Sequence, residues 1–335
     1  MSKRIHPKPV SLAEIFIKFS TDEQCLDYIS KMRWPDGVVR CPTCGDKNVT
    51  KYERPEAPTR KKRSETRKAE KANRRAWFYI CLNKDCRQQF SPTSGTLFAD
   101  SHLSLLTWFH AIGLMLNAKK GISAKQLQRD LGIGGYKTAW YLNHRIREAM
   151  GNGDIPKLGG VVEIDETYVG GQIRGKGVAY AKKQKQVVMG VLQRGGELRL
   201  EHVTGATLGN FREFIQKHVS QDVQRVMTDQ HPAYPAALES YSASHETVNH
   251  IAKEYVRGDV TTNGIESVFS LFKRGVIGQY HKLSGKHLQR YLTEFEYRFN
   301  RRNDADVFIE TVRRLCGFKP LRFADLTSDL EVAPF

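Results

Sequence analysis

Residues 160–171, GVVEIDETYVGG, decide the fold of this chain, because they predict a strand that is apolar except for acidic residues near its middle. Side chains alternate along a strand, so Glu163 and Asp165 share one face and Glu166 lies on the other. A single acidic residue in such a strand is more often a surface residue than a catalytic one. Asp165 therefore gains a chemical role only if further carboxylates converge on it.

Strands and helices alternate after this stretch, and together they predict an α/β domain over residues 153–302. The Arg-Gly-Gly sequence at 194–196 is a good hairpin turn, and Thr207 is a good helix N-cap. An apolar stripe over 286–302 predicts a helix that packs against the core. The other expected strands cover residues 186–192, 198–203, 224–229 and 247–250, and the other expected helices cover 207–219 and 264–275.

Two further carboxylates follow on these elements, Asp229 at the end of a strand and Glu266 on a later helix. Three carboxylates that converge on one point cannot all stay ionised without cations. Two Mg²⁺ ions, or Mn²⁺, suit these oxygen ligands and would support an in-line phosphoryl displacement. Two alternatives remain open: Asp229 can simply begin a turn before a His-Pro pair, and Asn263 can take the place of Glu266.

The charge of the chain favours a nucleic-acid partner. Lys and Arg outnumber Asp and Glu by 53 to 36, which gives a formal net charge of +17. Basic side chains that neutralise phosphates release counterions, and this gives affinity for DNA of any sequence. Lys273 lies two helical turns beyond Glu266 on the same helix face, so it and the adjacent Arg274 are candidates to contact the DNA backbone.

The sequence predicts a cytoplasmic protein without a membrane partner. Its longest apolar stretch, residues 103–116, is interrupted by polar residues and is shorter than the roughly 20 apolar residues that a membrane span needs. Residues 1–16 have no apolar run after their charges, so they do not form a secretory signal.

Four cysteines in two pairs predict one structural zinc site. Two residues lie between the cysteines of the first pair and four between those of the second, so each turn can direct two sulfurs at one ion. The expected ligands are Cys41, Cys44, Cys81 and Cys86. Four thiolates leave no open position for catalysis. Cys25 and Cys316 stand alone and are expected to be ordinary buried residues. A basic insert over residues 51–75 separates the pairs, and it is either a solvated excursion or a DNA-contacting arm.

Residues 101–152 predict a helix-turn-helix region, with helices over 105–117, from about 123 and over 136–150. In the last helix an apolar stripe is expected to face the core. That leaves Lys137, Asn143 and Arg145 to face a DNA groove. A helical hairpin without a DNA-reading role is the alternative.

The chain resembles the bacterial insertion-sequence transposases of the ISXO type, which carry an N-terminal zinc ribbon before an Asp–Asp–Glu or Asp–Asp–Asn domain. The matching stretches are CPTCG (41–45), CLNKDCRQQFSPTSGTLF (81–98), VVEIDETYVGG (161–171), VMTDQHPAY (226–234) and TTNGIESVFSLFKRGVIGQYHKLSGKHLQRYLTEFEYRFNRR (261–302). They span most of the chain and are specific in combination. The basic insert is longer than the pattern requires.

The resemblance implies a ribonuclease-H-like catalytic domain, a mixed sheet flanked by helices. It also implies two divalent metal ions and binding to the terminal inverted repeats of the element. Carried over to this sequence, Asp165, Asp229 and Glu266 are the expected metal ligands and Lys273 is the associated lysine. The 36 residues between Asp229 and Glu266 fit the pattern.

The expectation is therefore a DNA transposase that cleaves and transfers strands with Mg²⁺. Two element ends must be held together, so we expect a homodimer or higher oligomer on DNA. The alternatives are a catalytically silent DNA-binding regulator and a nuclease of the same fold. The expected domains are an N-terminal region (1–100) with a zinc ribbon (about 38–98), a helix-turn-helix region (101–152), the catalytic domain (153–302) and a tail (303–335).

Overall fold

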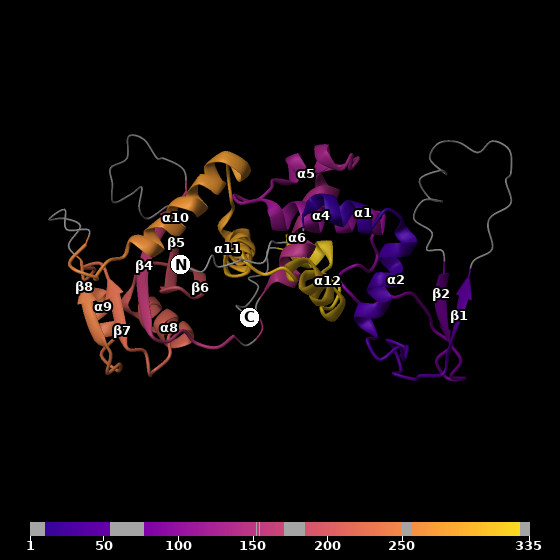
Figure 1. Ribbon diagram of the computed structural model, residues 1–335, viewed down its shortest axis with the longest axis horizontal. Helices are drawn as coiled ribbons and strands as arrows, with labels where there is room; N and C mark the ends of the chain where they lie inside the picture. The colour runs from indigo at the N-terminus through magenta and orange to yellow at the C-terminus, as the bar shows by residue number, and fades with distance from the viewer. Residues whose placement is uncertain are drawn as a thin grey trace, which may run out of the picture. The chain divides into compact units, whose positions relative to one another are not determined.

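The computed structural model describes residues 11–53, 77–151, 153, 155–170, 185–248 and 256–328. The chain divides into two units, each with its own core (Figure 1). The first unit comprises Met1–Ala118, Ala124–Met150 and Asp304–Phe335, and the second comprises Lys119–Ser123 and Gly151–Asn303. Among the described residues, no helix has the length and apolar character needed to cross a membrane.

The first unit is mainly helical. The helices are α1 (Leu12–Lys18), α2 (Asp22–Arg33), α4 (Leu105–Asn117), α5 (Ala124–Asp130), α6 (Tyr136–Met150), α12 (Val307–Gly317) and α13 (Phe323–Thr327). The bounds of α4 and α6 are those expected from the sequence. Helices α1 and α2 were not expected, although Ser11 and Thr21 each begin a capping box that is visible in the sequence.

The C-terminal segment belongs to the core of the first unit. Helix α12 packs against α2, α4 and α6. Its Phe308 lies 5.7 Å, between ring centroids, from both Phe19 and Phe109. The backbone N–H of Leu97 donates to the carbonyl oxygen of Leu315 at 3.1 Å. Helix α12, within the residues 303–335 that the sequence analysis left as a tail, therefore belongs to the apolar core of the first unit.

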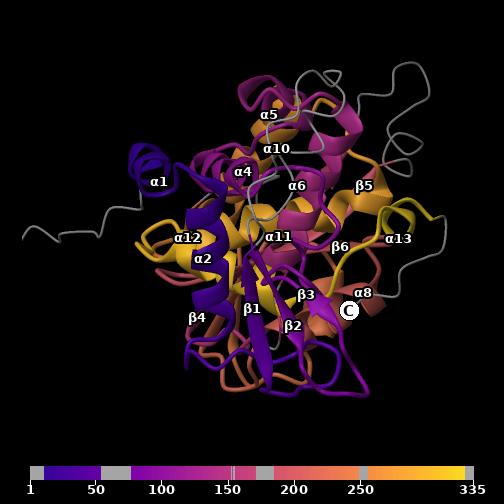
Figure 2. The ribbon, with the colours of Figure 1, turned by 90° about the vertical axis from the view of Figure 1, so that its right-hand side faces the viewer.

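Three short strands form an antiparallel ribbon in the first unit, in the order β1 (Val49–Glu53), β2 (Trp77–Cys81) and β3 (Gln89–Phe90) (Figure 2). Its core is aromatic: the Tyr79 ring lies 5.6 Å from Trp34 and 5.5 Å from Phe90, between centroids. The expected basic insert at 51–75 begins inside β1, and its remainder lies outside the described residues.

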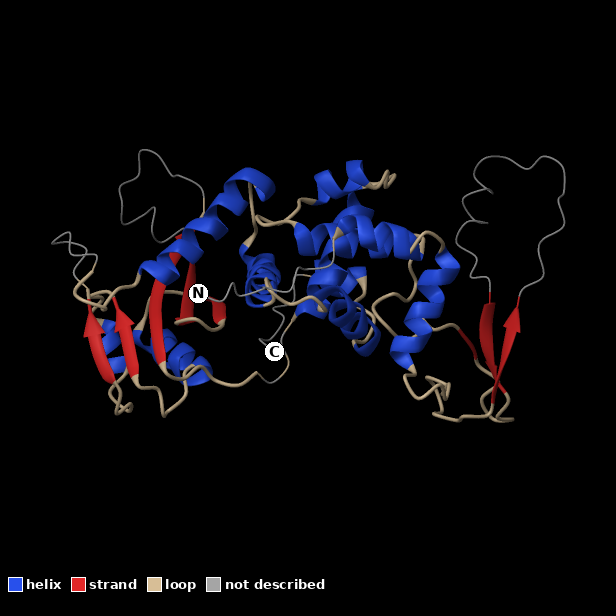
Figure 3. Ribbon diagram, in the orientation of Figure 1, coloured by secondary structure: helices blue, strands red, loops and turns tan. Residues whose placement is uncertain are grey.

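The second unit is built on a five-stranded sheet of order β6-β5-β4-β7-β8 (Figure 3). The strands are β4 (Val161–Val169), β5 (Gln186–Gln193), β6 (Leu198–Val203), β7 (Arg225–Thr228) and β8 (Ser244–Thr247). Strands β4, β5 and β6 are antiparallel neighbours, whereas β7 pairs parallel to both β4 and β8. Strand β8 begins three residues before its expected position.

Helices cover both faces of this sheet. Helices α8 (Leu208–His218) and α9 (Ala233–Ala237) pack on one face, where Val162 and Ile164 of β4 share a core with Phe211. Helix α10 (Asn263–Gly275) lies across β4 and β5 on the other face, beside α11 (Gly285–Asn300) (Figure 1). Gly190 of β5 permits this approach, because a Cβ there would lie 2.8 Å from Phe269 Cζ. The expected mixed α/β fold, a ribonuclease-H-like sheet between helices, is confirmed.

Candidate functional site

The parallel pairing of β4 with β7 brings two acidic side chains together. Glu163 pairs with Met227, so two residues further along each strand Asp165 lies beside Asp229. Glu166 completes the group: the carboxylate oxygens of Asp165, Glu166 and Asp229 lie within 4.8 Å of one another. The carboxyl end of a parallel strand pair is therefore the place where the acidic residues of the central strand meet those of its neighbour.

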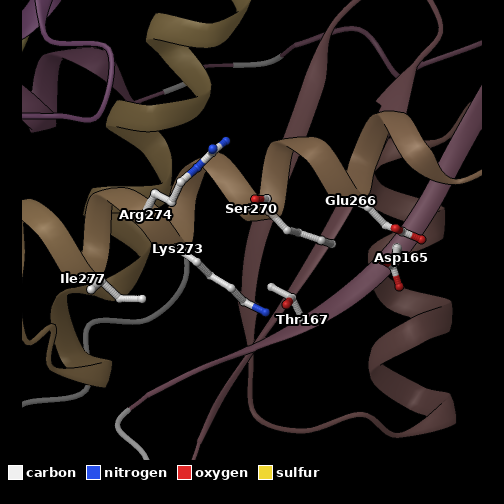
Figure 4. A pocket seen from close by; sticks show the side chains of 8 residues that line it. Asp165, Thr167, Glu266, Ser270, Lys273, Arg274 and Ile277 are labelled. Atoms are coloured by element: carbon white, nitrogen blue, oxygen red, sulfur yellow. The ribbon is translucent and has the colours of Figure 1, made fainter.

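Helix α10 adds Glu266 from the face of the sheet that Asp165 occupies. Asp165 and Glu266 line one open pocket of about 350 Å³, and Figure 4 shows the two side chains next to each other at one end of it. The Thr262 hydroxyl donates to Glu266 Oε1 at 3.0 Å. Asn263, the alternative to Glu266, is the exposed first residue of α10. The geometry thus favours Glu266 over Asn263.

The electrostatics of these carboxylates favour a bound cation. Burial raises the pKa of Asp165 to about 8, and the neighbouring carboxylates of Glu166, Asp229 and Glu266 add to the effect. Burial also raises the pKa of Glu166, and so does Asp229. Proximity to like charges disfavours ionisation of each carboxyl group unless a cation lies between them. All the donors are oxygens, which fits a hard divalent cation such as Mg²⁺ or Mn²⁺.

Lys273 lies on the same pocket, two turns of α10 beyond Glu266. Burial lowers the pKa of its ammonium group, whereas the attraction of Asp165 raises it and Lys185 lowers it further. Arg274, the next residue, also lines the pocket and is exposed. Both residues therefore place positive charge on the lining of the pocket that also holds Asp165 and Glu266.

Glu166 is a candidate ligand that the sequence analysis did not assign. It faces the α8–α9 side of the sheet, where it accepts a hydrogen bond of 3.0 Å from the hydroxyl of buried Tyr234. Strand alternation correctly separates Glu166 from Asp165, but it does not show that both carboxyl groups reach the same end of the sheet. The parallel register with β7 brings this about, and no local pattern in the sequence reveals that register.

We predict that Glu166→Gln weakens metal binding without unfolding the protein. The amide keeps the volume and still accepts the Tyr234 hydrogen bond, but it removes one negative charge from the cluster. Loss of a group that supports a metal site typically costs 10- to 100-fold in metal affinity or activity, on the order of one to two decades here. The measurement is the Mg²⁺ concentration that gives half-maximal strand cleavage. Tyr234→Phe removes only the hydrogen bond and serves as the milder comparison.

Glu163 holds the start of α10 against the central strand. It is only 3% exposed, and its Oε2 accepts a hydrogen bond of 3.1 Å from the backbone N–H of Ile265. Its Oε1 accepts from Arg194 Nε at 3.0 Å, and the same guanidinium donates to the carbonyl oxygen of Thr261 at 3.2 Å. This buried carboxylate therefore fixes the first turn of the helix that carries Glu266.

Gly264 is the point where this contact is closest, and it supports a second prediction. A Cβ at residue 264 would lie 2.6 Å from Glu163 Oε2 and 3.0 Å from Leu192 Cδ2, so Gly264→Ala must displace either the Glu163 carboxylate or the first turn of α10, and both break the contact between them. We expect a loss of stability of about 1–3 kcal/mol and a fall in the strand-cleavage rate of about 10- to 100-fold, with DNA binding retained.

The matched control is Gly209→Ala, at the second residue of α8, where a Cβ meets nothing closer than 4.0 Å. Thermal unfolding and single-turnover cleavage of the two variants give the comparison. Equal behaviour of Gly264→Ala and Gly209→Ala would contradict the role given to the Glu163 contact.

The second candidate site is the cysteine cluster of the ribbon. The sulfurs of Cys41 and Cys86 lie 3.7 Å apart and those of Cys44 and Cys81 lie 3.6 Å apart, and all four lie within 4.8 Å of one another. A tetrahedral zinc ion with Zn–S bonds of about 2.3 Å holds sulfurs roughly 3.8 Å apart. The expected zinc ligands therefore converge with the spacing that the ion needs. Cys25 is fully buried elsewhere, and Cys316 is half-buried.

The structure corrects the orientation expected for two residues of α6. Asn143 is 1% exposed and Arg145 is 3% exposed, so neither faces a DNA groove. The Arg145 guanidinium donates to the carbonyl oxygen of Ala99 and lies over the Trp108 ring at 4.8 Å. Helix α6 is enclosed by α4, α5 and α12, and this is why it is buried on more than one face. Lys137, in its first turn, is exposed as expected.

Comparison with known proteins gives one match that covers the carboxylate site and one that covers half of the cysteine cluster. Residues 157–300 match the model of the ISXO2-like transposase domain, and residues 20–64 match that of the transposase zinc-ribbon domain. The chain is 28% identical over 295 residues to an uncharacterized protein in transposable element ISH50 of Halobacterium salinarum. That match covers 84% of this chain and 91% of the relative. The zinc-ribbon match ends inside the basic insert, so it contains Cys41 and Cys44 but not the second cysteine pair.

Proposed function

We propose that this chain, which carries an ISXO2-like transposase domain and a transposase zinc-ribbon match, cleaves DNA at the ends of its element and joins these ends to target DNA. The observation that carries the proposal is the convergence of carboxylates on Asp165: Glu166 and Asp229, which follows β7, lie close to it, and Glu266 of α10 lines one pocket with it. Asp165, Asp229 and Glu266 are the proposed metal ligands, and Glu166 is close enough to take part.

The donor set fits two divalent cations, Mg²⁺ or Mn²⁺, because it offers several carboxylate oxygens at one point and no softer ligand. Two ions held by these carboxylates would supply activation of an attacking water or 3′-hydroxyl and stabilisation of the leaving oxygen. The protein contributes the fixed geometry: β4 and β7 are locked by the sheet, and Glu163 fixes the start of α10. Positioning of this kind supplies much of the rate enhancement in phosphoryl transfer.

The remaining basic residues are proposed to hold DNA. Lys273 and Arg274 line the catalytic pocket, where they would pair with phosphates next to the scissile bond. The first unit, with its zinc ribbon and helix-turn-helix, is proposed to bind the terminal inverted repeats. There Lys137 is an exposed candidate contact. Because two ends must be processed together, we propose a homodimer or higher oligomer on DNA.

The proposal is tested by cleavage and strand-transfer assays on DNA that carries the element's inverted repeats, with Mg²⁺ and with metal removed. We expect the wild type to cut and to join. Asp229→Asn and Glu266→Gln should bind the same DNA but do neither, whereas Asn263→Ala should stay active. Cutting without joining would favour a nuclease of the same fold. Tight DNA binding without metal-dependent chemistry would favour a catalytically silent regulator, and a reversed result for Glu266 and Asn263 would reassign the third ligand.

A further inference from the structure

The face of α10 that carries Glu266 continues beyond the carboxylates and ends in an exposed apolar side chain. Ser270, Lys273, Arg274 and Ile277 follow Glu266 at helical spacing, and all of them line the same pocket. Figure 4 shows Asp165 and Glu266 at one end of this row and Ile277 at the other. The Ile277 side chain is 74% exposed, so the row runs from acidic through basic to apolar.

Ile277 lies in a segment with a rare backbone conformation, a π-helix. It is the second residue of a π-helical turn, Val276–Tyr280, that continues directly from α10. Such turns are rare and are frequent at functional sites, because the extra residue redirects the side chains of the helix. This turn ends at His281, whose φ of 59° lies in the left-handed region. Local strain and an exposed isoleucine therefore coincide at the far end of the catalytic pocket.

The pocket lining offers positive charge and apolar surface, which match the phosphate and the base of a nucleotide. Lys273 and Arg274 offer cations, and Phe269 and Ile277 offer apolar surface. Phosphate binding alone would require only the cations. The volume of about 350 Å³ is within the range of small-ligand sites, roughly 300–1,000 Å³. An exposed aliphatic side chain next to basic residues is also the feature with which DNA-bending proteins unstack base pairs.

We propose that a base of the element-end DNA leaves its stack and packs on Ile277, while Lys273 and Arg274 hold the adjoining phosphates. This inference rests on the proposed function and names the part of the substrate that reaches this end of the pocket. Ile277 follows Glu266 by eleven residues, about 16 Å along a helix axis. The base therefore lies within about five nucleotides of the scissile phosphate, given roughly 3.4 Å per base pair of duplex.

The experiment places the fluorescent base 2-aminopurine, in turn, at each position close to the cleavage point on pre-cleaved end DNA. It uses the full-length protein with its zinc. Unstacking brightens this base, so we expect one position to brighten several-fold when the wild type binds. Ile277→Ala should lose most of that increase, whereas Ile277→Leu should keep it. Leu208→Ala removes an exposed leucine on α8, on the opposite face of the sheet, and should match the wild type.

A second readout separates base unstacking from a merely structural role. An abasic site at the brightened position removes the cost of unstacking. It should therefore restore the cleavage rate of Ile277→Ala to that of the wild type on the same DNA. A folding defect in the variant would not be repaired by a change in the DNA.

Two results would overturn the inference and leave the proposed function intact, provided that the wild type cuts and joins DNA. One is that no position brightens. The other is that Ile277→Ala brightens the base as the wild type does; if this variant also lowers the mass of the protein–DNA complex, the face is instead a contact with a second copy of the chain. A wild type that neither cuts nor joins would instead remove the proposed function itself.

Discussion

Replacing Asp165 by asparagine is expected to abolish strand cleavage and, at the same time, to stabilise the metal-free protein. The substitution removes the charge of a proposed metal ligand, so we expect the single-turnover cleavage rate to fall on the order of 10³-fold or more, as for loss of a principal transition-state stabiliser. It also removes a carboxylate whose ionisation is opposed by burial and by Glu166, Asp229 and Glu266. Activity falls and stability rises because carboxylates that would hold a cation repel one another when no cation is bound.

The pH dependence of unfolding follows from the same carboxyl group. The pKa of Asp165 is about 8 in the folded protein and about 3.9 in an unfolded chain. Between these values the folded state binds more protons, so stability falls as pH rises. The contribution of Asp165 is fully present below about pH 4 and is lost as pH rises to about 8. Glu166, whose pKa is also raised, acts in the same direction.

Thermal unfolding of the zinc-loaded protein without Mg²⁺, between pH 5 and pH 9, measures this effect. The melting temperature of the wild type should decline with pH, and that of Asp165→Asn should decline less and lie above it at pH 8. Added Mg²⁺ should raise the melting temperature of the wild type, because it binds only the folded state, and should raise that of Asp165→Asn less. A less stable Asp165→Asn protein at pH 8 would contradict this picture of the site.

Loss of the zinc ion is expected to unfold the ribbon of the first unit. The strands β1, β2 and β3 have a small aromatic core, and structural zinc contributes about 10–16 kcal/mol of apparent binding energy in isolated zinc fingers. Cys44→Ser should therefore lose the ion and the ribbon together. Metal analysis, with amide hydrogen exchange across β1 and β2, gives the measurement.

Cys316→Ser is the matched control, because this half-buried thiol lies outside the cluster. It should keep one zinc ion for each chain. The carboxylate site is in the other unit, so Cys44→Ser should lose binding to element ends while the Mg²⁺-dependent stabilisation of the second unit remains. An intact ribbon in zinc-free protein would contradict the structural role of the ion.

Local signals in the sequence were sufficient for most of the elements. Strand β6, helix α4 and helix α6 have the expected bounds, and Thr207 caps α8 by accepting a hydrogen bond from the Asn210 N–H. The four clustered cysteines could also be predicted, because the spacing within each pair is a local property of the sequence. Strand alternation correctly separated Asp165 from Glu166, and helix periodicity correctly placed Lys273 on the face of Glu266.

Features that depend on contacts between distant segments of the chain could not be predicted from local patterns. Asn143 and Arg145 lie off the apolar stripe of α6, so periodicity predicted them to be exposed, but α12 comes from more than 150 residues further along the chain and helps to enclose this helix. The Glu163 contact joins β4 to the start of α10, about 100 residues later. A buried charge with a distant partner leaves no periodic trace in the sequence.

The most direct test of the central claim is joining of a pre-cleaved element end to a target plasmid by the purified protein. The claim is that the carboxylates of β4, β7 and α10 form a divalent-metal site for strand transfer. It predicts a joined product with wild type and Mg²⁺, none when the metal is chelated, and none with Asp165→Asn, although that variant still binds the end. Joining by Asp165→Asn at the wild-type rate, or joining that persists without a divalent metal, would contradict it.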